Sequence, residues 1–202
     1  MPTAAGQRGA HEIGRDDRKV TPVPPPLLVV LAGRPGTGKT TIGRLLAGRL
    51  QAAYLRTDVI VGPMLSAGLT EDEAGAARVG YDIACEVATE NLHAGVPVVV
   101  DGVNASHERR KLWRDVSGAT GARLVQLETM LPDGAEHRRR VDRRGAGVGY
   151  IGPTWEQILE MRYDVWHEAT DGPRLIVDTS DTDAALAACL AHVALSAAAS
   201  VR

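Results

Sequence analysis

A glycine-rich run that ends in a lysine and a threonine is the part of this sequence whose residue types most clearly predict chemistry. Residues 33–40 read Gly-Arg-Pro-Gly-Thr-Gly-Lys-Thr, which matches the spacing G-x-x-x-x-G-K-[S/T]. In such a loop, glycines let backbone N–H groups turn inward around phosphates, lysine supplies a positive charge, and threonine offers a hydroxyl to Mg²⁺. The sequence therefore predicts a nucleotide-binding loop, with contacts from Gly33, Gly36, Thr37, Gly38, Lys39, Thr40 and Thr41.

Two aspartates follow short apolar runs that we expect to be neighbouring strands. Asp58 comes soon after residues 53–55, and Asp101 directly follows residues 96–100. Because the carboxyl ends of parallel strands share one crevice, we expect Asp58 to face the γ-phosphate and to accept a proton from an attacking hydroxyl. Asp101 is expected to hold Mg²⁺, directly or through water. The alternative for Asp58 is a helix cap. Asn104 is expected either to position the acceptor or a phosphate, or only to satisfy turn backbone.

The elements that position these residues alternate between short apolar runs and longer helical stretches. Apolar runs this continuous suit strands buried on both faces, so the pattern predicts an α/β fold, a three-layer α/β/α arrangement with a five-stranded parallel sheet. The expected strands are 27–32, 53–55, 96–100, 124–127 and 175–177. The expected helices are 39–51, 71–94, 106–118, 133–144, 154–168 and 182–199. Capping signals are Thr70 with Glu73, Thr154 with Gln157, and Ser106.

The bulk properties set the wider frame. The 202 residues suit one domain, predicted at 26–202, after a proline-containing arm at 1–25 that lacks apolar periodicity. With a formal net charge of −2, the protein has no overall positive potential to attract the phosphate backbone of a nucleic acid, so we do not expect a nucleic-acid partner. Cys85 and Cys189 lack disulfide or zinc spacing, and we expect no membrane span and a cytoplasmic location. The sequence leaves the oligomeric state open, a homodimer included.

A second basic feature follows the fourth expected strand. Residues 137–144 read His-Arg-Arg-Arg-Val-Asp-Arg-Arg, and a glycine-rich segment at 145–152 comes next. Arg140, Arg143 and Arg144 fall within about one helical turn, so they can clamp a triphosphate and stabilise charge on the transferred phosphoryl group. The alternative is a solvated basic face. We therefore predict an arginine-bearing lid at about 138–153, with the glycines as hinges.

Together these motifs resemble a family of P-loop kinases that groups polynucleotide 5′-kinase domains with zeta-toxin-like and chloramphenicol phosphotransferase-like enzymes. The resemblance covers about residues 27–180 and rests on the loop, on Arg56-Thr57-Asp58-Val59-Ile60, on Val100-Asp101-Gly102-Val103-Asn104 and on the arginine run. It implies that Asp58 is the catalytic base and that Arg140 and Arg144 act from the lid with Lys39. It also implies an acceptor held near Arg78 and Tyr81, where ordinary packing is the alternative.

The activity that these features predict is transfer of the γ-phosphate of ATP, with Mg²⁺, to a hydroxyl of a nucleoside-like, sugar, antibiotic or other natural-product acceptor. A gluconate kinase would carry D-x-x-H where this chain has Asp58-Val59-Ile60-Val61. A shikimate kinase would carry D-x-D and Gly-Gly-Gly motifs, and both are missing. A GTPase would need an [NT]KxD motif, which Lys111 does not form. The alternatives are a polynucleotide 5′-hydroxyl kinase, a regulatory ATPase without acceptor, and a toxin acting on a sugar nucleotide.

Overall fold

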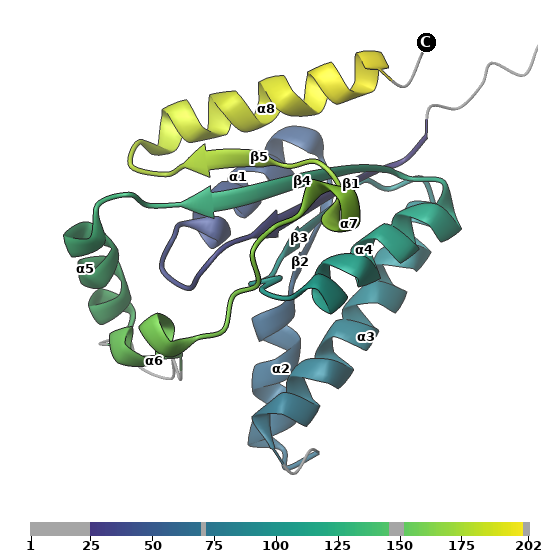
Figure 1. The fold of residues 1–202 in the computed structure, drawn as a ribbon. Helices are drawn as coiled ribbons and strands as arrows, with labels where there is room; N and C mark the ends of the chain where they lie inside the picture. The colour runs from purple at the N-terminus through teal and green to yellow at the C-terminus, as the bar shows by residue number, and fades with distance from the viewer. Residues whose placement is uncertain (1–24, 70–71, 146–151, 200–202) are drawn as a thin grey trace, which may run out of the picture.

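The computed structural model describes residues 25–69, 72–145 and 152–199. Five parallel strands form one sheet in the order β2-β3-β1-β4-β5, as Figure 1 shows. The strands are β1 (Leu27–Ala32), β2 (Ala53–Arg56), β3 (Val98–Asp101), β4 (Arg123–Met130) and β5 (Leu175–Asp178). The helices in these ranges are α1 (Lys39–Leu50), α2 (Thr57–Ser66), α3 (Glu73–His93), α4 (His107–Thr120), α5 (Gly134–Gly145), α6 (Trp155–Glu160), α7 (Glu168–Asp171) and α8 (Thr182–Ala199). The predicted α/β class and five-stranded parallel sheet are confirmed.

The sheet is covered on both faces because alternate side chains of its strands point to opposite sides. On one face, Val29 and Leu31 of β1 pack with Leu46 of α1 and Leu186 of α8. On the other face, side chains of β1 and β3 pack with α3 and α4, and this cluster includes Leu28, Val30, Val98, Val100, Ala84 and Trp113. These two cores hold the central strands rigid, so the loops at their carboxyl ends have a fixed base.

The strand register brings the predicted motifs to one edge of the sheet. Asp101 of β3 lies beside Leu31 of β1 on one side and beside Arg56 of β2 on the other. The glycine-rich loop follows β1, and Asp58 lies in the first turn of α2 directly after β2. Three segments that are far apart in the sequence therefore end together, as the strand order requires.

The helix α2 was not predicted from the sequence. α2 contains Gly62, Pro63 and three β-branched residues in succession, a composition with low helix propensity. It packs against α3 so closely that a Cβ built at Gly80 would lie 2.5 Å from a Val61 methyl carbon. Burial between α2 and α3 has therefore overridden local propensity.

The single helix predicted over 154–168 was wrong. α6 ends at Glu160, residues 162–167 are irregular, and α7 covers only Glu168–Asp171. The backbone of this irregular stretch is hydrogen-bonded to residues far away in the sequence. The Asp164 N–H donates to the Ala105 carbonyl at 2.8 Å, and Arg110 donates to the Asp164 carbonyl at 2.7 Å. Tertiary hydrogen bonds have replaced helical ones.

Two of the three capping predictions are confirmed. Thr154 and Gln157 form a reciprocal capping box at α6, and the Ser106 side chain accepts from the Arg109 N–H at α4. At α3 the cap is Asp72, whose side chain accepts from the Gly75 N–H. Thr70, which we had expected to cap α3, lies outside the described residues.

Parts of two further predictions also fall outside those ranges. Of the expected arm at 1–25, only Pro25 is described, and the expected lid at 138–153 is described at 138–145, within α5, and at 152–153. Among the described helices, none combines the length and the apolar character that crossing a membrane requires.

Candidate active site

The loop between β1 and α1 has the backbone shape that the motif predicts. Gly33, Gly36 and Gly38 have φ values of +135°, +90° and +91°, which residues with a Cβ rarely adopt. A Cβ at Gly33 would lie 2.5 Å from the Thr129 carbonyl oxygen, and one at Gly36 would lie 2.6 Å from a Val141 methyl carbon. The loop thus requires glycine for space as well as for conformation, and its cradle fits a phosphate chain.

Lys39 is bonded within this loop. Its Nζ donates to the carbonyl oxygens of Gly33 at 2.7 Å and Arg34 at 2.9 Å, and the residue is only 7% exposed. Burial lowers the pKa of Lys39 to about 8, an effect that nearby Asp101 opposes and Arg144 increases. A phosphate anion in the cradle would supply the negative charge that this ammonium group lacks.

Asp101 is the buried acidic centre of the site. Its Oδ2 accepts hydrogen bonds of 2.7 Å from both Thr40 and Tyr54, while the Arg56 Nε lies 3.8 Å away. Burial, followed by the hydrogen bond to Asp101, raises the pKa of Tyr54, so its hydroxyl stays a donor. The described residues contain no cluster of three or more His, Cys, Asp or Glu that could hold a metal by itself. The donor set of Thr40 and Asp101 fits Mg²⁺ shared with nucleotide phosphates.

Asp58 differs from Asp101 in being open to solvent. Its side chain is 61% exposed, and its Oδ2 accepts from Arg56 at 2.9 Å. Arg56 therefore lies between the two carboxylates, close to each. This places Asp58 at the rim of the site, with a free face for a second molecule.

The arginines of α5 face the glycine-rich loop across a cavity of about 270 Å³. The cavity is lined by Gly36, Gly38, Thr41, Arg140, Arg143, Arg144 and Thr182. Arg140 and Arg143 donate to Glu136 at 3.0 and 3.1 Å. Hydrogen bonds from Arg140 and Arg139 hold the pKa of Glu136 below its usual value. The glycine-rich loop and α5 thus line one cationic pocket, as expected for a triphosphate site.

Two of the predicted acceptor-side residues, Asn104 and Tyr81, contact each other in the interior of the protein. The Asn104 side chain is fully buried, donating to the Leu31 carbonyl at 2.7 Å and accepting from the Trp113 indole at 2.9 Å. Tyr81 is 7% exposed, and its hydroxyl accepts from the Asn104 N–H at 3.2 Å. Both therefore have the contacts of scaffold residues, whereas Arg78 is exposed on α3.

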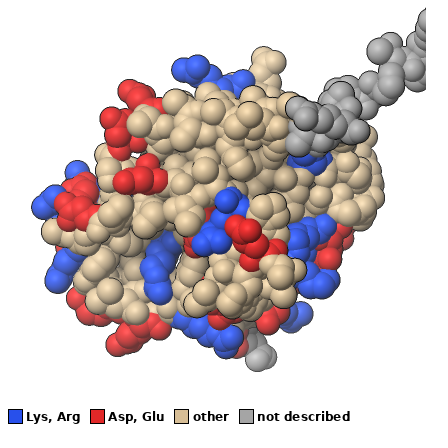
Figure 2. All heavy atoms as spheres, turned by 45° about the horizontal axis from the view of Figure 1, so that its top comes forward, with Lys and Arg blue, Asp and Glu red and all other residues tan. Residues whose placement is uncertain are grey.

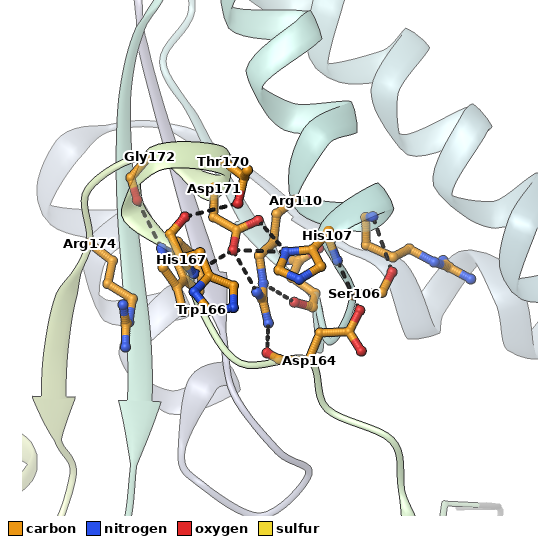
Figure 3. Close-up of polar contacts among 12 residues, drawn as sticks. Ser106, His107, Arg110, Asp164, Trp166, His167, Thr170, Asp171, Gly172 and Arg174 are labelled. Carbon is orange, nitrogen blue, oxygen red and sulfur yellow. Dashed lines mark hydrogen bonds and ion pairs between the residues drawn. The ribbon is translucent and has the colours of Figure 1, made fainter.

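Sequence reasoning missed a buried ionic cluster beside the site. Asp171 accepts hydrogen bonds from Arg110 at 3.0 Å and from His107 Nδ1 at 2.9 Å. Figure 3 draws these contacts as dashed lines. Burial alone would raise the pKa of Asp171, but the hydrogen bonds from His107 and the His167 N–H, together with Arg110, hold it below the usual value. Arg110 also donates to the Asn104 carbonyl at 3.0 Å, so the cluster supports the loop after Asp101. No motif spacing in the sequence links these residues.

Comparisons with known proteins agree with this geometry. The family model described as AAA domain matches residues 28–165. A shikimate kinase from Corynebacterium diphtheriae is 35% identical over 115 residues, which span 52% of this chain and 66%, just under two thirds, of that protein. A shikimate kinase from Saccharopolyspora erythraea is 32% identical over 168 residues, or 74% of this chain and 89% of that protein.

Among solved structures, the APS kinase of Mycobacterium tuberculosis in complex with AMPPNP and APS has the same fold. Its TM-score is 0.60 at 22% identity, over 85% of this chain and 99% of that one. The matching family model covers more than half of the sequence and includes the glycine-rich loop, Asp58 and Asp101. This chain belongs to that AAA domain family and is a member of the P-loop small-molecule kinases.

Proposed function

We propose that this protein is an ATP-dependent phosphotransferase that moves the γ-phosphate to a hydroxyl group of a small molecule. The observation that carries the proposal is the cavity in which the glycine-rich loop faces three arginines of α5, with Asp58 at the neighbouring strand end. Phosphoryl transfer requires positioning and charge stabilisation more than covalent chemistry by the protein, and this arrangement supplies both.

On the phosphate side, each residue has a distinct part. The backbone N–H groups of residues 33–38 and the Lys39 ammonium hold the phosphates, and Thr40 with Asp101 holds Mg²⁺. Mg²⁺ supplies neutralisation of phosphate charge when bound. Arg140, Arg143 and Arg144 stabilise the charge that spreads over the transferred group. Arg140 and Arg143 exchange the Glu136 carboxylate for phosphate oxygens as they do so.

On the acceptor side, Asp58 is the general base. Its exposed carboxylate accepts the proton of the attacking hydroxyl and orients that oxygen in line with the phosphate. The hydrogen bond from Arg56 keeps one oxygen of Asp58 occupied and leaves the other for the acceptor. Arg56 also lies near Asp101, so it fixes the base relative to the metal side of the site.

The acceptor itself we propose to be a nucleoside-like compound, a sugar or another natural product that is not shikimate. Arg56 stands where a shikimate kinase would have the first aspartate of D-x-D. Asn104 stands in the loop where Gly-Gly-Gly is expected, with its buried side chain bonded to the Leu31 carbonyl and its φ at +48°. The grouping with zeta-toxin-like and chloramphenicol phosphotransferase-like enzymes remains a prediction that the acceptor would decide.

A polynucleotide acceptor is the less favoured alternative. Figure 2 shows acidic and basic side chains interspersed over the face it presents, with no continuous basic track among the described residues there. Together with the net charge of −2, this distribution favours a small acceptor over a nucleic-acid strand.

The test is ATP consumption with Mg²⁺ across a panel of nucleosides, sugars, hydroxylated antibiotics, shikimate, gluconate and a 5′-hydroxyl oligonucleotide. Mass spectrometry then looks for a product heavier by one phosphoryl group. A phosphorylated small molecule is the expected result, and its rate of formation should fall about 100-fold in Asp58→Asn. If ATP hydrolysis is slow, no compound accelerates it and Asp58→Asn does not change it, the kinase proposal is wrong and a regulatory ATPase is the better assignment.

A further inference from the structure

Arg34 lies inside the nucleotide-binding motif but its side chain is directed away from the phosphate cradle. Its guanidinium donates to the carbonyl oxygens of Ile158 at 2.6 Å and Met161 at 3.1 Å, at the end of α6. The group also lies 5.4 Å from the centre of the Tyr163 ring. A cation at these carbonyls satisfies acceptors that the end of a helix leaves without partners.

The helix that Arg34 holds contacts the arginine-bearing helix. Trp155, the first residue of α6, meets the His137 ring edge to face, with ring centres 5.1 Å apart and an interplanar angle of 84°. His137 lies on α5, is 8% exposed, and its Nε2 donates to the Pro35 carbonyl at 2.7 Å. The contacts therefore form a closed circuit from Arg34 through α6 and α5 back to Pro35, the next residue of the loop.

The chain beyond α6 has a second buried anchor, Arg110. Arg110 donates to the Asp164 carbonyl at 2.7 Å and pairs with Asp171, and its guanidinium lies 4.5 Å from the centre of the Trp166 ring (Figure 3). Arg110 and Asp171 are almost fully buried, and the Tyr163 ring lies 5.4 Å from the guanidinium groups of both Arg110 and Arg34, so the two arginines share one neighbour. Arg110 therefore holds the chain that follows α6, and Arg34 holds the end of α6 itself. We expect Arg34 to set the position of α6 relative to the glycine-rich loop.

We infer that Arg34 is a positioning residue: acting through α6 and His137, it sets the α5 arginines over the phosphate cavity. Nothing in its contacts brings the guanidinium to the cavity, which Gly36, Gly38 and Arg140 line. Arg34, a residue of the glycine-rich loop, therefore helps to position the α5 arginines on the opposite side of the phosphate cavity. This inference rests on the proposed function of the α5 arginines as phosphate ligands.

The test is a double-mutant cycle between Arg34→Ala and the pair Arg140→Ala with Arg144→Ala. In the wild-type background we expect Arg34→Ala to lower kcat about 100-fold, because small displacements of catalytic groups cost rates of that order. It should also weaken binding of AMPPNP with Mg²⁺ about tenfold. In the background that lacks Arg140 and Arg144, Arg34→Ala should change either quantity less than about twofold, because neighbours acting as a unit are not additive.

Controls separate positioning from folding. Arg162→Ala removes an 86% exposed arginine from the same region and should change neither kcat nor AMPPNP affinity. Arg34→Lys keeps a donor for one carbonyl and should recover part of the loss. If Arg34→Ala does not fold, Trp155→Leu breaks the same circuit at α6 and should give the same non-additive pattern.

Two results would overturn the inference: an unchanged kcat and affinity in both Arg34→Ala and Trp155→Leu, or a full loss that persists without Arg140 and Arg144. The second result would mean that Arg34 acts on the nucleotide by another route. If no acceptor is ever phosphorylated, the proposed function fails, while the cycle measured on AMPPNP affinity still decides the role of Arg34.

Discussion

The phosphate side and the acceptor side of the site are built in different ways. On the phosphate side, Lys39 and Asp101 are 7% and 3% exposed, and their polar atoms are bonded to the loop, to Thr40 and to Tyr54. On the acceptor side, Asp58 is 61% exposed and bonded only to the adjacent Arg56 among the residues described.

In the proposed function, this difference means that the fold prepares the phosphate half of the reaction more fully than the acceptor half. The backbone of the phosphate cradle is fixed in advance, whereas Lys39, Arg140 and Arg143 exchange their present partners for phosphate oxygens. The acceptor side is open, and part of its shape must come from the acceptor and from the α2 and α3 helices beside it. Changes on the phosphate side should therefore affect every reaction of the protein, and changes at Asp58 should affect only transfer.

The largest effect should come from Lys39→Met. Loss of the charge at the phosphates should lower kcat/KM by at least about 10³-fold, because it removes stabilisation of a buried, developing negative charge. The midpoint temperature of thermal unfolding should be at least as high as that of the wild type, because an apolar side chain replaces a buried ammonium group. Lys111→Met, which changes a lysine that is 62% exposed, is the matched control and should leave kcat/KM within about twofold. Retention of a tenth of the activity in Lys39→Met would contradict the assigned role.

Asp58→Asn should separate the two sides. We expect kcat to fall about 100-fold, because the amide cannot accept the hydroxyl proton, while AMPPNP affinity stays within about twofold. Asp115→Asn, at a carboxylate that is 57% exposed and outside the site, is the control. A parallel loss of nucleotide affinity would place Asp58 on the phosphate side and break the comparison.

Asp101→Asn should act through the metal. The amide oxygen still accepts from Thr40 or Tyr54, but the negative charge is lost, so the Mg²⁺ concentration for half-maximal rate should rise about 10- to 100-fold. Titration of the rate with Mg²⁺ at saturating ATP measures this shift. An unchanged Mg²⁺ requirement would remove Asp101 from the metal site.

The smallest effect is a pH dependence that belongs to Lys39. Because burial lowers its pKa to about 8 from 10.5, nucleotide affinity should fall as pH rises through about 8, by up to about tenfold per pH unit. Between pH 8 and 10.5 the unfolded state binds more protons at this group, so its contribution to the free energy of unfolding should rise with pH. Urea unfolding and AMPPNP binding at several pH values, compared with Lys39→Met, isolate both trends. Identical pH profiles in the two proteins would show that Lys39 has an ordinary pKa.

The sequence determined the fold class and the phosphate side. The glycine spacing, Lys39 and Thr40 specify a loop whose backbone shape needs those residues, and apolar runs specify strands buried on both faces. The helix caps at Thr154 and Ser106 could also be predicted, because each cap is formed with a residue only three positions later in the sequence.

Only the tertiary structure decided the rest. α2 forms against its own propensity because α3 packs on it, and the helix expected over 154–168 breaks because arginines from distant segments bond its carbonyls. Asn104, for which the sequence left both an acceptor or phosphate contact and a backbone role open, is buried by partners on β1 and α4. Arg34 belongs to the motif, yet its direction depends on a helix more than a hundred residues later in the chain. Contacts between residues far apart in sequence leave no spacing pattern, so the direction of such side chains appears only when the chain is folded.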